Sequence, residues 1–313
     1  MKKVHDFFKK FYWLFILGAV LNVIFGLVAF GLDYSNEQFI FPRVGSSLFF
    51  LSLIITLGFA VYFSYETRHL HITKIRKQSS NFLKLTSWLA FSVAILFFLF
   101  ETIKIIAVPY LEEPGVFTFP RIARYLLCLP LAGYFFIEAF PTKIKKKKIV
   151  FPIGLRYAFS ICTILWGIFS ILTIYFDQNL STTNMLKNWQ IIFYLALTFF
   201  FLFEAKFEHI KPNGLSYILS ATVLFILASS FSVTVILSLS LNFLPLDYSE
   251  CYTEVEYVSA FIFGLYAYAR LHAILKTMKH IMDNDEKGTF SSKFNKTPND
   301  FATDSAEQEN IDK

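Results

Sequence analysis

The sequence has 313 residues, of which 55% are hydrophobic and only 17% are Asp, Glu, Lys or Arg, and its mean hydropathy is +0.52. This composition is too apolar for an ordinary soluble domain and indicates a chain that resides in a membrane. The apolar stretches are long and do not alternate with polar residues, which favours helices over the strands of a transmembrane barrel. We therefore expect an all-α, polytopic membrane protein.

Eight apolar stretches are each long enough to cross a hydrocarbon core of about 30 Å as a helix. In chain order they lie near residues 11–32, 44–64, 85–108, 122–140, 157–176, 189–207, 216–244 and 257–275. Lys2 and Lys3 before the first stretch also occur in signal peptides, but this stretch is too long for a cleaved one and ends without a clear cleavage site. We interpret it as a retained first helix and residues 1–282 as one eight-helix membrane domain.

The 29 Lys and Arg residues are distributed unevenly between the two sides that these helices define. Most fall in the N-terminal segment, in every second link and from Arg270 onward, whereas the other links are acidic. Because short basic links are retained on the cytoplasmic side, we expect an integral protein of the cell membrane with both termini in the cytoplasm. The basic run Lys145–Lys148 should contact anionic lipid at this face and not nucleic acid.

The composition changes abruptly at about residue 283, where Asp, Asn, Lys, Ser and Glu replace the apolar residues. Such a segment cannot bury enough apolar surface to fold. Residues 283–313 are therefore expected to form a disordered cytoplasmic tail.

The helices contain an internal repeat. FIFPRV at 39–44 recurs as FTFPRI at 117–122, and each copy opens a helix that descends toward the cytoplasm. Glu66, Glu138 and Glu204 align near the ends of the descending helices, and a further step of 66 residues leads to Arg270. The chain therefore reads as four helical hairpins.

The aligned charges are the first candidate site. Each lies inside the expected membrane boundary, where an ionisable side chain usually faces protein or water. We expect Glu138, Glu204 and Arg270 to converge on a polar cavity open to the cytoplasm, with Glu66 nearer to water. The alternative is that they are interface anchors of a duplicated hairpin.

A second polar group is expected near the outer surface. Glu101 and Lys104 lie late in the third helix, and Arg121 and Arg124 open the fourth. Glu101 and Arg124 have similar predicted depth, so we expect a salt bridge between them. This cluster either clamps the second hairpin or binds an anionic ligand.

The seventh helix is rich in hydroxyl side chains. Ser230, Thr234 and Ser238 follow one another at intervals of four residues, which favours tight packing against another helix. A permeation path lined by hydroxyls is the alternative. The dispersed cysteines and the lack of a helix-spaced histidine pair predict no metal site and no cofactor.

Two classes of function fit these features, and neither is catalytic. Repeated hairpins and charges within helices favour a transporter or permease-like protein for a small solute or ion. The alternative is a non-catalytic membrane sensor or assembly partner, and an enzyme ranks third. The lipid bilayer is the expected partner, and the sequence leaves protein partners open.

Overall fold

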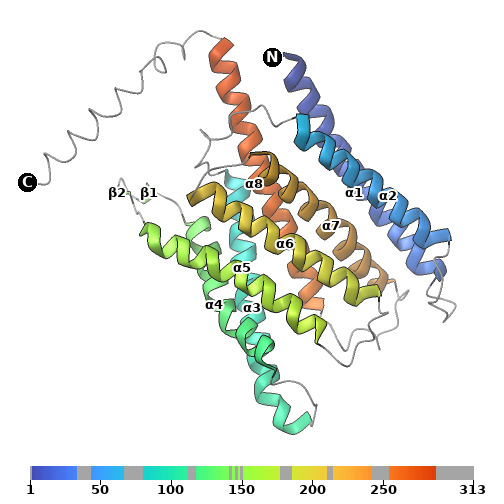
Figure 1. Cartoon of the computed structure of the whole chain (residues 1–313), viewed down its shortest axis with the longest axis vertical. Coiled ribbons are helices and arrows are strands. Elements are labelled where there is room, and N and C mark those ends of the chain that lie inside the picture. The colour runs from blue at the N-terminus through green and yellow to red at the C-terminus, as the bar shows by residue number, and fades with distance from the viewer. Residues whose placement is uncertain are drawn as a thin grey trace, which may run out of the picture.

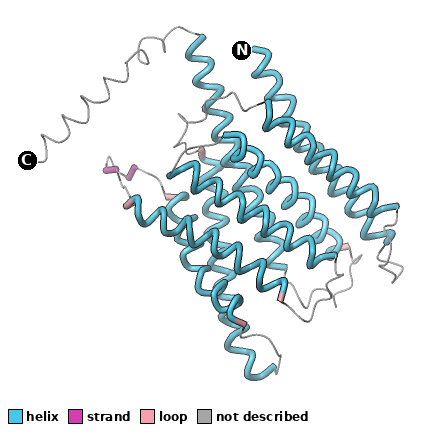
Figure 2. Tube along the Cα trace, viewed as in Figure 1, coloured by secondary structure: helices cyan, strands magenta, loops and turns pink. Residues whose placement is uncertain are grey.

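The chain is helical almost throughout the residues that its computed structural model describes, which are 2–33, 44–66, 80–111, 118–140, 143–144, 147–148, 151–176, 185–209, 214–241 and 254–286. The helices are α1 (Lys2–Asp33), α2 (Val44–Glu66), α3 (Asn81–Leu111), α4 (Phe119–Ala139), α5 (Ile153–Tyr175), α6 (Met185–His209), α7 (Gly214–Ser240) and α8 (Glu254–Glu286). Two short strands, β1 (Lys143–Ile144) and β2 (Lys147–Lys148), pair antiparallel between α4 and α5 (Figure 2).

Each described helix overlaps one of the eight predicted stretches. The largest differences are at the chain ends, since α1 begins at Lys2 and α8 continues to Glu286. The predicted tail of residues 283–313 therefore starts inside α8, and residues 287–313 lie outside the described part. The predicted Pro in the first turn is found in α4, where Pro120 follows the N-terminal cap residue Thr118.

The architecture is that of a multi-pass membrane protein. Among the described residues, six helices are long and apolar enough to cross a membrane, and these are α2 to α7. The apolar part of α1, Trp13–Ala29, is shorter. Large apolar side chains such as Ile54, Ile103 and Leu126 are exposed on the outside of the bundle, where hydrocarbon would cover them. Eight complete spans remain a prediction.

Six of the described helices form a closed ring. Each helix from α3 to α7 packs against the next one in the sequence, and α3 also packs against α8 (Figure 1). Close packing is visible between α7 and α8, because a Cβ on Gly264 would collide with the Cβ of Ala228. At one end of the ring lie the β1–β2 hairpin, the start of α1 and the projecting end of α8, and we call this the basic end.

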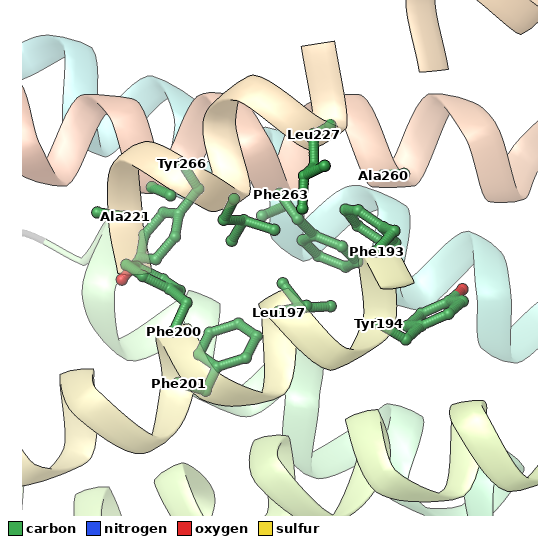
Figure 3. Packing of buried hydrophobic residues seen from close by; sticks show 14 of the residues in the cluster. Phe193, Tyr194, Leu197, Phe200, Phe201, Ala221, Leu227, Ala260, Phe263 and Tyr266 are labelled. Carbon is green, nitrogen blue, oxygen red and sulfur yellow. The ribbon is translucent and has the colours of Figure 1, made fainter. Parts of the chain in front are cut away.

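Aromatic side chains fill the interior of the ring. Phe135 of α4 stacks on Phe263 of α8 with ring centroids 5.5 Å apart and lies 6.0 Å from Phe201 of α6. Figure 3 shows the side chains of α6 packed against those of α7 and α8. Trp166 of α5 is fully buried against Phe263. The centre of the ring is thus a packed aromatic layer.

The first hairpin lies outside this ring. α1 and α2 pack against each other and against α7, at the edge of the molecule in Figure 1. An additional aromatic contact joins α2 to α6, where Phe49 and Phe50 meet Trp189. Three hairpins therefore surround the interior, instead of the four that the sequence period suggested.

A buried polar network fastens the first hairpin to α7. The Asn22 amide nitrogen donates to Thr56 Oγ1 and Ser230 Oγ, both at 3.1 Å, and Ser52 Oγ donates to Asn22 Oδ1 at 2.5 Å. The prediction of tight packing by the hydroxyls of the seventh helix is confirmed for Ser230, and the Thr234 hydroxyl bonds back to the Ser230 carbonyl. Ser230 thus faces the first hairpin and not the ring interior.

We expect Asn22→Ala to loosen the first hairpin. The change removes bonds to both α2 and α7, and at about 0.6 kcal/mol for each interhelical bond in a membrane the loss should be about 2 kcal/mol. The measurement is the midpoint of thermal unfolding in one detergent. Val20→Ala, at an exposed position of the same helix, is the control and should leave the midpoint nearly unchanged. Equal effects of the two changes would contradict this role of Asn22.

Candidate functional site

The two helices α4 and α8 carry complementary charges at matching heights. Arg124 and Glu138 are 14 residues apart on α4, and Glu256 and Arg270 are 14 residues apart on α8. Fourteen residues are nearly four helical turns, or about 21 Å, so both charges of a helix lie on one face. An Arg of one helix therefore meets a Glu of the other at each end of the ring.

The cluster nearer the basic end, which we call the Arg270 cluster, consists of Glu138, Arg156, Glu204 and Arg270. Arg270 Nε donates to Glu204 Oε1 at 2.5 Å, and Arg270 Nη2 lies 2.5 Å from the same oxygen. Arg270 Nη1 lies 3.5 Å from Glu138 Oε2. The structure therefore brings together the three charges that the repeat aligned, one each from α4, α6 and α8. Their role in binding a ligand remains a prediction.

Arg156 is a member of this cluster that the sequence analysis missed. Its Nη2 lies 2.5 Å from Glu138 Oε1, and its side chain is 24% exposed, more than its partners. The predicted fifth helix began near residue 157, which assigned Arg156 to a basic link. In the structure α5 begins at Ile153, so Arg156 is fixed in the first turn beside α4.

Tyrosines surround the buried part of the Arg270 cluster. Tyr134 and Tyr266 are buried with their hydroxyl oxygens 3.4 Å apart, and Tyr217 lies beside the Glu204 carboxylate. Glu66 does not belong to the cluster on the described elements, since it ends α2 in the hairpin outside the ring. Its side chain lies outside the described part of the structure.

The cluster at the opposite end, which we call the Arg124 cluster, consists of Arg124, Tyr194 and Glu256. Arg124 Nη2 donates to Glu256 Oε1 at 2.6 Å and to the Tyr194 hydroxyl at 3.4 Å. The guanidinium carbon also lies 5.3 Å from the ring centroid of Phe97, 5.7 Å from that of Tyr194 and 5.9 Å from that of Trp166. Arg124 is therefore held by one carboxylate and three aromatic rings.

The predicted salt bridge between Glu101 and Arg124 is wrong in its pairing. Glu101 Oε2 instead accepts a hydrogen bond from Arg121 Nε at 3.2 Å, which forms a separate rim pair between α3 and α4. Arg121 and Arg124 are almost one turn apart on α4, so depth alone does not decide which one faces α3. Arg124 points into the ring toward α8. The side chain of Lys104 lies outside the described part of the structure.

Contacts across the ring follow the sequence period. Arg124 and Glu256 are 132 residues apart, as are Tyr134 and Tyr266, and the same difference separates Glu138 from Arg270. Glu204 and Arg270 are 66 residues apart, which is half of that value. Residues at equivalent positions of the period therefore contact one another across the ring.

Several buried polar atoms at the Arg124 end have no hydrogen-bond partner among the described residues. They are Arg124 Nε, Glu256 Oε2 and the side-chain oxygen of Gln190, which lies one turn before Tyr194 on α6. An unmade hydrogen bond of a buried group costs about 1–3 kcal/mol. The Arg124–Glu256 pair thus leaves hydrogen-bonding capacity unused.

Neither cluster resembles a metal centre. The part of the chain that the structure describes holds no group of three His, Cys, Asp or Glu side chains placed to share a metal ion. Comparison with known protein families, with curated proteins and with solved structures finds no match for this chain. The fold and the two charge clusters therefore carry the functional argument.

Proposed function

We propose that the protein is a permease-like membrane protein for a small solute or ion, with the ring of α3 to α8 as its translocation unit. The observation that supports this most strongly is the pairing of α4 with α8 through an Arg–Glu contact at each end of the ring. In this proposal the Arg124 cluster and the Arg270 cluster close the two ends. By the distribution of basic residues, the basic end faces the cytoplasm.

The chemistry of buried ion pairs favours a contact that opens. Removing two charges from water costs several kcal/mol per ion, and apolar replacements of similar volume are often as stable or more so. Stability alone therefore does not account for Arg–Glu pairs inside an aromatic ring. A pair that separates when water enters has both charges solvated at that moment, which makes it suited to a reversible closure.

The arrangement of α8 supports coupled movement of the two ends. Its residues Glu256 and Arg270 contribute to both closures, and the aromatic layer around Phe263 lies between them. A tilt of α8 relative to α4 that separates one pair would press the other together. The solute would then have access to the ring from one side at a time.

A membrane sensor or assembly partner is the second candidate function. It is favoured by the α1–α2 hairpin outside the ring and by the part of α8 that projects beyond the other helices in Figure 1. These elements offer helix surface to another protein. A sensor of this kind does not require the two ends of the ring to open in turn, which separates the two candidates experimentally.

Cys128 provides a native reporter for opening at the Arg124 end. It is buried one turn after Arg124, whose carbonyl oxygen is 3.4 Å from its sulfur. In protein carrying Cys162→Ser and Cys251→Ser, we expect Glu256→Gln to raise the rate of labelling by a membrane-impermeant thiol reagent about tenfold. A tenfold change corresponds to about 1.4 kcal/mol less cost of opening. The measurement is labelling in nanodiscs followed by mass spectrometry.

Two further variants make this experiment decisive. Glu101→Gln breaks the rim pair but leaves the Arg124–Glu256 contact, so it should leave Cys128 protected. Arg270→Gln opens the other end and should also leave Cys128 protected. Equal labelling in all three variants would indicate general loosening of the bundle, and protection in Glu256→Gln would show that this pair is not a closure. Either outcome contradicts the proposal.

A further inference from the structure

We propose that the Arg124 cluster, together with Gln190, is a binding site for a small zwitterionic solute that carries one carboxylate and one ammonium group, as an amino acid does. This inference deepens the proposed function and depends on it for the entry of the solute. The observations that carry it are the buried pair of opposite charges, the unpartnered polar atoms around it and the aromatic side chains beside it.

A zwitterion is the class of solute that keeps the charge of this site balanced. Arg124 is 3% exposed and Glu256 is 8% exposed, and each is the other's partner at 2.6 Å. If the pair separates, the solute carboxylate can bind Arg124 while its ammonium binds Glu256. A simple anion would leave Glu256 buried without a cation, and a simple cation would leave Arg124 without an anion, which costs several kcal/mol.

The unpartnered atoms match the two ends of such a solute. Arg124 Nε is a donor suited to a carboxylate, whereas Glu256 Oε2 and the Gln190 side-chain oxygen are acceptors suited to an ammonium group. Gln190 is 4% exposed and lies 66 residues after Arg124 and 66 before Glu256, the period that relates contacting residues in this ring. Three helices, α4, α6 and α8, therefore present complementary groups at one level.

The surroundings of Arg124 also limit the rest of the solute. Phe97, Trp166 and Tyr194 place aromatic rings within 5.3–5.9 Å of the guanidinium carbon. Such rings would pack against a compact apolar body. The Arg270 cluster is less suited to this role, because Arg270 already directs Nε, Nη1 and Nη2 at the two carboxylates of Glu138 and Glu204.

The test is equilibrium binding to the purified full chain in nanodiscs, with each of the common amino acids as the probe. We expect saturable binding of at least one apolar amino acid. Its methyl ester lacks the carboxylate and its N-acetyl derivative lacks the ammonium group. Each analogue should bind about 10- to 100-fold more weakly, the usual effect of losing a charge-assisted hydrogen bond. This comparison needs no mutation and so does not depend on the folding of a variant.

Variants then assign the two charges to their residues. Arg124→Gln and Glu256→Gln should each weaken binding of the amino acid by about tenfold or more. Arg124→Gln should in addition abolish the difference between the amino acid and its methyl ester, because the carboxylate no longer has its partner. Lys206→Gln removes a positive charge at an exposed position of α6 and should leave the affinity within about twofold.

The possible outcomes separate this inference from the proposed function. Failure of every amino acid to bind, or equal binding of the esters and N-acetyl derivatives, overturns the zwitterion site. If Cys128 labelling still responds to Glu256→Gln, the permease proposal stands with another class of solute. Binding with the expected analogue pattern but without any labelling response supports the site and contradicts the permease proposal.

Discussion

Arg270→Gln should destabilise the protein more than any other single neutralisation in the Arg270 cluster. The change leaves Glu138 paired with Arg156 but removes the cation that contacts Glu204, whose side chain is only 2% exposed. Removing one partner of a buried pair costs about 3–5 kcal/mol because the remaining charge is uncompensated. The expected result is a fall of several degrees in the midpoint of thermal unfolding in detergent.

Two companion variants test the cause of that loss. Arg156→Gln should have a smaller effect, since its more exposed position allows water to reach Glu138. The double variant Arg270→Gln with Glu204→Gln should recover most of the lost stability, because no unpaired carboxylate remains between α6 and α8. Additive losses in the double variant would show that the pair is not the source of the effect.

Reversal of Arg124 should produce a loss of similar size at the other end of the ring. Arg124→Glu places two carboxylates where the pair was 2.6 Å apart and puts one of them against the aromatic rings that held the guanidinium. Combined Arg124→Glu and Glu256→Arg should restore the attraction and part of the stability. Restoration should be incomplete, since aromatic faces attract a cation and repel an anion.

The measurement for the charge exchange is a double-mutant cycle on unfolding midpoints in one detergent. The coupling between positions 124 and 256 should be favourable and large compared with the coupling between positions 101 and 124. The rim pair of Glu101 with Arg121 makes the second coupling the matched reference. A larger coupling of Glu101 to Arg124 would contradict the pairing in the structure.

The repeat predicted which charges meet at the basic end, and it did so without any knowledge of packing. Glu138, Glu204 and Arg270 occupy equivalent positions of a 66-residue period, and equivalent positions of similar hairpins come to similar depth and face. The structure places them in contact. What the period leaves open is how many hairpins take part, since α1 and α2 lie outside the ring.

The missed members, Arg156 and Glu256, share one cause. Both were assigned to links because an apolar stretch appears to begin after the last charge, while the helix itself begins earlier, at Ile153 and at Glu254. The wrong partner for Arg124 has another cause. Depth follows from counting residues, but the direction in which a side chain points depends on helix rotation, which neighbouring helices determine.

The tryptophans show the same limit of sequence periodicity. Trp13, Trp88 and Trp166 lie early in the first helices of three hairpins, which supported the repeat. In the structure their exposure is 64%, 41% and 0% respectively. Equal spacing therefore does not give equal environments, because the first hairpin packs outside the ring and each later one meets different neighbours.

Closure of the ring by α3 and α8 has a consequence for the order in which the protein is made. α8 is the last described helix to be synthesised, yet it supplies Glu256 to Arg124 and Arg270 to Glu204. Helices inserted earlier therefore hold those charges in the membrane before their partners exist. Arg156 reaches Glu138 one helix later, so the waiting period falls on Arg124 and Glu204. Nascent chains stopped before α8 should be the forms most dependent on chaperones that shield polar groups in the bilayer.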